Sequence, residues 1–157
     1  MTQRVDLATV MDRLAIDEVI SGYAAAVDDT DWPGFLALYT PEGRADHRAA
    51  GGIEGSAAEV ADWLAGVLGR FPVRQHLIGN RRLAFEDVGG YPGDRAEVRA
   101  DCLTTMFPES GERTTSVGRY TFGLSRTDDG WRLHGVVVRE GAPGGAGGAA
   151  RHRDGES

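Results

Sequence analysis

Two residues far apart in the chain, Asp28 and His76, are of the types that together perform acid–base chemistry. Asp28 lies in the segment V-D-D-T-D-W, and His76 lies in R-Q-H-L-I-G-N. A carboxylate beside an imidazole fixes which ring nitrogen carries the proton and makes the ring a competent base near neutral pH. If the fold brings the two together, we expect a site that moves protons.

The first of these residues lies at the end of a predicted helix. From Leu7 to Val27, apolar residues recur at helical spacing, and Asp6 is placed to cap the start. Asp31-Trp32-Pro33 is typical of the beginning of a second helix, which Pro41 would end. The sequence therefore predicts two helices joined by a tight corner, with Asp28 at that corner.

The second residue lies in a predicted strand, where Ile78 and Asn80 share the face of His76 because side chains alternate. A short strand is predicted from Arg44 to Ala50. A capping-box pattern at Ser56-Ala57-Ala58-Glu59 opens a third helix. Further strand-like runs are Val73 to Val88, Arg95 to Phe107, Arg113 to Thr127 and Trp131 to Glu140. Helices followed by an antiparallel meander predict an α+β fold.

Composition narrows the functional classes. The chain has 157 residues, 41% of them hydrophobic, which suits one domain with a single core. A net charge of −7 without any long basic run argues against nucleic acid as a partner. The single cysteine, Cys102, excludes an internal disulfide and fits a reducing cytoplasm. We find no signal peptide and no apolar stretch of membrane-spanning length, so no membrane association is expected.

The chain divides into a domain at residues 1–140 and a tail at residues 141–157. The tail is rich in glycine and has almost nothing to bury, so we expect it to be disordered. His152 lies in this tail, which argues against a catalytic role for it.

Several other chemistries lack their motifs. The sequence contains no G-x-S-x-G, P-loop, H-E-x-x-H or C-x-x-C pattern. His47, His76 and His134 could form a three-histidine metal site, but their spacing matches no local ligand motif. We therefore predict a site without metal and without cofactor.

Three segments resemble a known family: Y-A-A-A-V-D-D-T-D-W-P-G-F-L-A-L-Y-T-P-E-G, R-Q-H-L-I-G-N and G-R-Y-T-F-G-L-S-R-T-D-D-G-W-R-L. They are similar to the SnoaL-like branch of the nuclear transport factor two-like superfamily, over about Asp6 to Arg139. The resemblance implies a curved, mostly antiparallel sheet wrapped on three N-terminal helices, an α+β barrel with a conical cavity between the sheet and the first helix. Members often dimerise through the outer face of the sheet, so a homodimer is expected.

Within that superfamily the chain most resembles the scytalone dehydratases. The resemblance implies that Asp28 and His76 are catalytic, and it places His47 where that family has a substrate-polarising tyrosine. Two family residues are missing, because the second catalytic histidine falls near Phe107-Pro108 and a helix-end tyrosine falls on Val27.

Strand alternation extends the predicted site. It gives a mostly apolar wall from Ala100, Cys102, Thr104, Met106, Tyr120 and Phe122. The predicted substrate-binding residues are Tyr23, Trp63, Asn80, Tyr120 and His134, the last because it shares parity with Val136 and Val138. Each candidate also has a structural interpretation: Asp28 as a helix cap, His76 and His47 as strand histidines, and the aromatic residues as core.

These features predict a cofactor-free lyase or isomerase, a dehydratase or cyclase, that acts on a polyketide-like or aromatic natural product. The substrate class comes from the resemblance. The alternative is a non-catalytic small-molecule binder or accessory subunit with the same fold, because a fold alone does not fix function.

Overall fold

The computed structural model describes residues 6–143, with only the backbone described for residues 140–143. The helices are α1 (Leu7–Asp28), α2 (Trp32–Ala37) and α3 (Ala57–Leu68), with a short 3-10 helix, η1 (Arg48–Ala50). All three predicted caps are confirmed. Asp6 accepts a hydrogen bond from the Thr9 amide, Asp31 caps α2, and Ser56 caps α3. Within the described part of the chain, no helix is long and apolar enough to cross a membrane.

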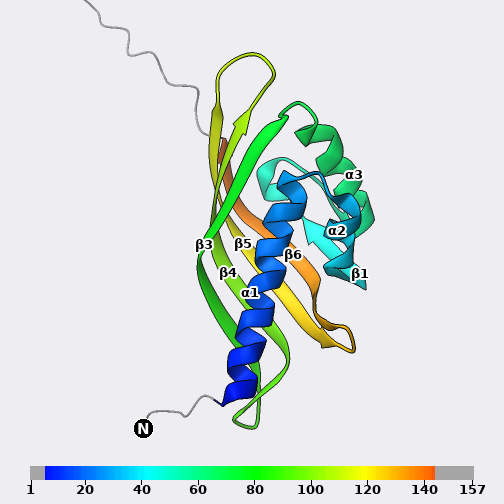
Figure 1. Cartoon of the computed structure of the whole chain (residues 1–157), viewed down its shortest axis with the longest axis vertical. Helices are drawn as coiled ribbons and strands as arrows, with labels where there is room; N and C mark the ends of the chain where they lie inside the picture. The colour runs from blue at the N-terminus through cyan, green and yellow to red at the C-terminus, as the bar shows by residue number, and fades with distance from the viewer. Residues whose placement is uncertain (1–5, 144–157) are drawn as a thin grey trace, which may run out of the picture.

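Six strands form one curved sheet that does not close (Figure 1). They are β1 (Tyr39–Asp46), β2 (Glu54–Ser56), β3 (Val73–Val88), β4 (Tyr91–Phe107), β5 (Thr114–Thr127) and β6 (Gly130–Pro143). The order across the sheet is β2-β1-β6-β5-β4-β3, in which β3 to β6 form the predicted antiparallel meander. β1 pairs with β6 in parallel, a pairing that the sequence did not indicate. The α+β prediction is confirmed.

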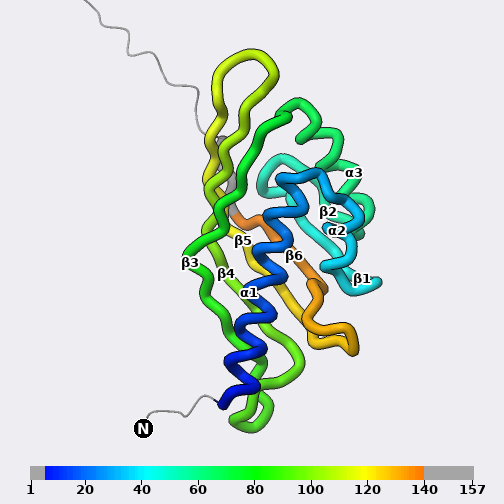
Figure 2. The backbone as a smooth tube through the Cα atoms, in the orientation of Figure 1, coloured from blue at the N-terminus to red at the C-terminus, as the bar shows by residue number. Residues whose placement is uncertain are grey.

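α1 lies along the inner face of the sheet, with α2 and α3 gathered near its C-terminal end (Figure 2). The core forms where this helix meets the strands. Its fully buried members include Ile16, Ile20, Tyr23, Val27, Val98, Phe122, Leu124 and Val136. The apolar stripe of α1 is buried only in its later turns. Near the start of the helix, Leu7, Met11 and Leu14 are 74%, 61% and 63% exposed.

Two predicted boundaries were wrong. The strand expected at Arg44 to Ala50 instead begins at Tyr39 and gives way to η1. β6 continues to Pro143, three residues into the predicted tail, because its backbone keeps pairing with Ser116 and its neighbours in β5. The rest of the tail, with His152, lies outside the described residues.

Among the bulges of the sheet, two change which way predicted site residues point. On β3, Gly79 pairs with Asp101 and Arg82 pairs with Arg99, so β3 has one residue more than β4 in this interval, and Asn80 there has a φ of 50°. On β6, His134 is the extra residue opposite Gly123 and Leu124 of β5. An extra residue reverses the inside–outside alternation beyond it.

Candidate active site

Asp28 and His76 meet, as predicted. Asp28 is the last residue of α1, and His76 is the fourth residue of β3. One carboxylate oxygen lies 2.6 Å from the imidazole Nδ1, and the other accepts a hydrogen bond of 2.9 Å from the His76 backbone amide. The side chains are 19% and 10% exposed, respectively. The carboxylate thus holds the ring and its backbone at once.

This contact sets the chemistry of the imidazole. With Nδ1 facing the carboxylate, its proton lies between the two groups and the lone pair is left on Nε2. Among the described residues, nothing hydrogen-bonds to Nε2 of His76. An imidazole in this state can accept a proton at Nε2 while Asp28 stabilises the resulting positive charge.

Arg74, which sequence reasoning missed, holds the two segments together. It lies two residues before His76 on the same inner face and is only 6% exposed. Its guanidinium donates to the Val27 carbonyl at 2.8 and 3.1 Å and to the Phe71 carbonyl at 2.9 Å. Val27 lies in the last turn of α1, where carbonyls lack partners within the helix and carry partial negative charge, so its carbonyl suits a buried cation. The only sequence signal was that Arg74 has the same strand parity as His76, and its charge argued against burial.

His47 lies in the same interior. It follows β1 directly and is 4% exposed, with its Nε2 3.4 Å from the Tyr23 hydroxyl and its ring 5.6 Å from that of Trp63. Burial lowers the pKa of His47 to about 4, while nearby Asp46 opposes the shift and the positive form of His76 adds to it. His47 is therefore neutral at physiological pH. Its Nδ1 is buried without a hydrogen-bond partner among the described residues.

A cluster of tyrosines completes the polar part of this interior. The rings of Tyr23 and Tyr120 are 6.3 Å apart, and burial raises the pKa of both hydroxyls, so both are neutral donors. Tyr39, which sequence reasoning placed on a helix, is the first residue of β1 and joins the cluster. Burial raises its pKa as well, and its hydroxyl is buried with no partner among the described residues. Two polar atoms, Tyr39 Oη and His47 Nδ1, are thus buried and unsatisfied.

The predicted inner wall of β4 is largely present. Ala100, Cys102 and Thr104 are buried on the inner face, whereas Met106 is only partly buried. The Cys102 sulfur lies 3.6 Å from the Thr104 hydroxyl, and burial raises the pKa of the thiol. This wall offers apolar surface, with Cys102 in its protonated form.

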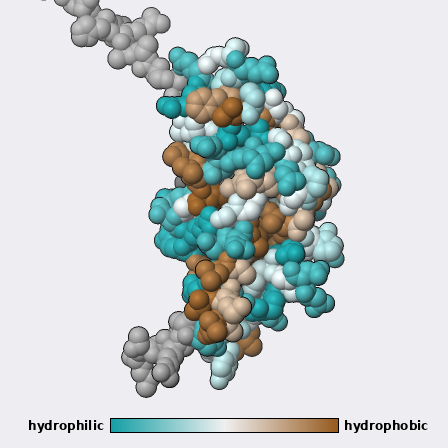
Figure 3. Space-filling view, viewed as in Figure 1, coloured by the Kyte–Doolittle hydropathy of each residue, from teal (hydrophilic) through white to brown (hydrophobic). Residues whose placement is uncertain are grey.

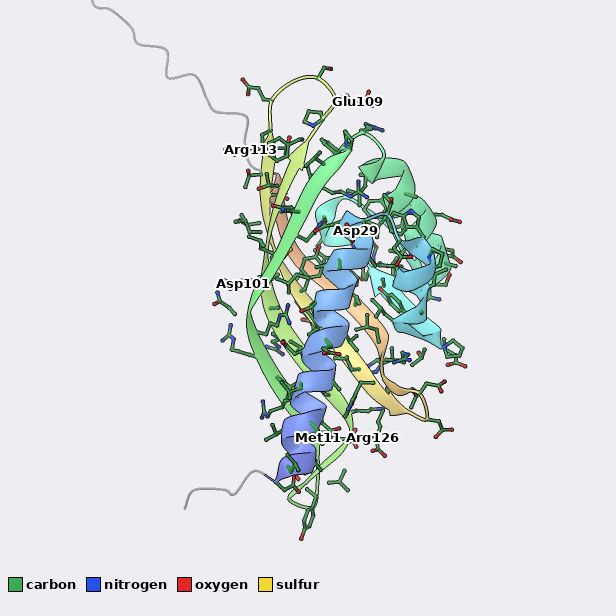
Figure 4. All side chains as sticks on the ribbon, in the orientation of Figure 1. Met11, Asp29, Asp101, Glu109, Arg113 and Arg126 are labelled. Atoms are coloured by element: carbon green, nitrogen blue, oxygen red, sulfur yellow. The ribbon has the colours of Figure 1, made fainter. Side chains whose placement is uncertain are left out.

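Two predicted substrate-binding residues lie away from this interior. Asn80 is exposed and donates to Asp101, and Figure 4 shows Asp101 on the side of the sheet away from the helices. His134 is exposed and hydrogen-bonded to Ser125, with its ring beside Gly123. Asn80 and His134 each lie at a bulge, where the inside–outside alternation of side chains along the strand is interrupted. With His134 on the outer face, the three-histidine metal site is excluded.

The geometry agrees with the family comparisons. The model of the SnoaL-like domain matches residues 8–137. An uncharacterized protein of Mycobacterium tuberculosis strain H37Rv is 33% identical over 131 residues, which are 82% of this chain and 85% of the relative.

Solved structures share the fold. A candidate aromatic ring hydroxylase from Novosphingobium aromaticivorans is 25% identical, with a TM-score of 0.73 over 85% of this chain and 94% of that one. A candidate scytalone dehydratase from the same species is 17% identical, with a TM-score of 0.70 over 83% of this chain and 84% of that one. A hexachlorocyclohexane dehydrochlorinase from Novosphingobium barchaimii is 20% identical, with a TM-score of 0.72 over 88% and 94%.

Proposed function

Because the chain belongs to the SnoaL-like family, we propose that it is a cofactor-free lyase or isomerase that works by proton transfer at His76. The observation that carries the proposal is the double contact of Asp28 with the ring and the backbone amide of His76. A helix cap requires only a bond to a backbone amide. Asp28 also binds the ring of His76, and both side chains are largely buried, which favours a catalytic pair.

In the proposed reaction, Nε2 of His76 removes a proton from the carbon next to a substrate carbonyl. The electron pair of the broken C–H bond forms an enolate, and Asp28 stabilises the imidazolium. In a dehydration the enolate then expels a hydroxyl group from the neighbouring carbon, and that oxygen takes the proton back from His76 and leaves as water. In an isomerisation or cyclisation the proton returns to another atom of the same molecule.

The enolate oxygen needs a donor, and the interior offers neutral ones. His47, Tyr39 and Tyr120 are uncharged at neutral pH. The unsatisfied atoms on His47 and Tyr39 support a role in binding a substrate oxygen, because buried polar atoms in native proteins normally have partners. We therefore assign the polarising role to this group and not to Asn80.

We propose an aromatic or polyketide-like natural product as the substrate. The aromatic rings of Tyr23 and Tyr120 and the apolar wall of β4 support a ring-bearing, mostly apolar molecule. Two of the proteins that share the fold are named for eliminations, one of water and one of hydrogen chloride. Elimination of water or hydrogen chloride removes a proton from the substrate, which is the step assigned to His76.

The test is mass spectrometry of producer-cell metabolite extracts incubated with wild-type protein, His76→Ala or Asp28→Asn. We expect wild type alone to convert one metabolite, with loss of water for a dehydratase and no mass change for an isomerase or cyclase. Incubation in D2O adds a second readout, because reversible proton removal at carbon introduces deuterium into the unreacted substrate.

Two variants of the same chain serve as matched controls. Asp29→Asn makes the same change one residue beyond the dyad, on an exposed helix cap, and His134→Ala removes a histidine from the other side of the sheet. Both should keep full turnover. Turnover by folded His76→Ala would reject the proposal. Ligand binding without conversion by any protein would instead support a binding or accessory role.

A further inference from the structure

The outer face of the sheet carries arginines on neighbouring strands, away from the dyad. Arg82 on β3, Arg99 on β4, Arg119 on β5 and Arg139 on β6 line one hollow of about 360 Å³. We call these four residues the arginine row. Each is exposed on the face that points away from α1. The chain as a whole carries a net charge of −7, so this concentration of positive charge is local.

The register of the sheet makes the arrangement electrostatically unfavourable by itself. Arg82 lies directly opposite Arg99 in the β3–β4 pairing, and Arg99 lies opposite Thr121 in the next pairing. Like charges directly opposite each other on one face of a sheet are destabilising. The bulge at Asn80 is what turns Arg82 to this face.

The carboxylates nearby neutralise only part of this charge. Arg99 donates from Nε to Glu97 at 2.9 Å, and Arg119 lies 3.6 Å from Asp101. Arg139 donates from Nε to the neutral hydroxyl of Thr121 at 3.2 Å. Among the described side chains, Arg99 and Arg119 thus have carboxylate partners, whereas Arg82 and Arg139 have none.

Several guanidinium nitrogens are available to a ligand. The contacts of Arg99 and Arg139 with described residues use Nε alone, so their terminal nitrogens are unpaired there. Arg82 makes no hydrogen bond or ion pair with the described residues. Donors from separate strands can surround a tetrahedral anion with several acceptor oxygens, whereas a planar carboxylate is satisfied by one guanidinium fork.

From this geometry we infer that the arginine row is a binding site for a phosphate dianion, either free or as a monoester. The anion would bridge Arg82 and Arg99 and relieve their repulsion, with Arg139 as a third donor. The site is separate from the dyad, because the sheet lies between them.

The test titrates inorganic phosphate and phenyl phosphate into the full chain at pH 7.5 and constant ionic strength, followed by calorimetry and thermal unfolding. Proteins compared are wild type, Arg82→Gln and Arg139→Gln. The control is Arg113→Gln, an exposed arginine on the distant β4–β5 hairpin (Figure 4). We expect saturable binding to wild type and Arg113→Gln, and binding at least about tenfold weaker in the other two, as loss of a charge-assisted hydrogen bond predicts.

The two probes distinguish the source of the phosphate. Equal affinity for both supports free phosphate, and tighter binding of phenyl phosphate supports an ester. Non-saturable binding, or an equal effect of phosphate on all four proteins, would overturn the inference. So would absence of binding together with a dimer that dissociates in Arg82→Gln, because a second copy would then occupy this face.

Discussion

The two faces of the sheet use polar residues in opposite ways. On the inner face, the charged groups are buried or half-buried and are held by backbone groups: Arg74 by the carbonyls of Val27 and Phe71, and Asp28 by the amide of His76. On the outer face they are many and exposed, Arg82, Arg99, Arg119 and Arg139 among them. Figure 3, which shows the side of the molecule with α1 in front, has hydrophilic and apolar residues intermixed on that surface. Inner-face residues should therefore control stability and chemistry, and outer-face residues should control neither.

The largest expected effect is on the inner face, at Arg74. In Arg74→Met, the carbonyls of Val27 and Phe71 lose a buried donor, so the free energy of unfolding should fall by about 3 kcal/mol or more. Urea unfolding measures this. Arg82→Met on the outer face is the matched control and should change stability by no more than about 0.5 kcal/mol. Equal losses in the two variants would remove the distinction between the faces.

The next effect depends on pH and concerns His47. Its pKa is about 4 when folded and near 6.5 when unfolded, so the unfolded chain binds the extra proton between these values. The contribution of neutral His47 to the free energy of unfolding should be complete above pH 6.5. It should fall by up to roughly 3 kcal/mol as the pH drops to 4. Unfolding curves of wild type and His47→Phe at several pH values isolate this contribution. A constant difference between them would contradict the neutral, buried state of His47.

A smaller effect of opposite sign is expected at Tyr39. Its hydroxyl is buried without a partner among the described residues, so Tyr39→Phe should leave stability unchanged or raise it by up to about 1 kcal/mol. Tyr23→Phe is the comparison and should lower stability slightly, because the Tyr23 hydroxyl contacts His47. Chemical denaturation distinguishes the two. A clear loss in Tyr39→Phe would mean that the hydroxyl has a partner in the folded protein.

The smallest effect is expected at Asn80. Its φ of 50° suits glycine, and the exposed contact with Asp101 contributes little, so Asn80→Gly should change stability by no more than about 0.5 kcal/mol. Turnover, measured on the substrate that wild type converts, should be unchanged. If the folded variant lost turnover, Asn80 would have to contribute to the active site after all.

Residues could be placed from the sequence wherever the helical or strand periodicity is unbroken. Asp28 and His76 were found because α1 and the first part of β3 keep their regular periods up to these residues. Asn80 and His134 were misplaced because each sits at a bulge, which no local period encodes.

Other features depend on contacts across the chain. Arg74 was missed because a charged strand residue suggests exposure, and only its bonds to the carbonyls of Val27 and Phe71 make its burial favourable. The parallel pairing of β1 with β6 joins segments distant in sequence, so no local pattern indicates it. The fold class itself was predictable, since it depends only on the order of helices and strands.

The contact between Asp28 and the amide of His76 has a second consequence, because β3 is the last strand of the sheet. An edge strand offers unpaired amides to which a strand of another molecule can add, a route to aggregation. Asp28 occupies one such amide, at the fourth residue of β3. The carboxylate that orients the imidazole thereby also removes one hydrogen-bond donor from the edge to which another strand could add.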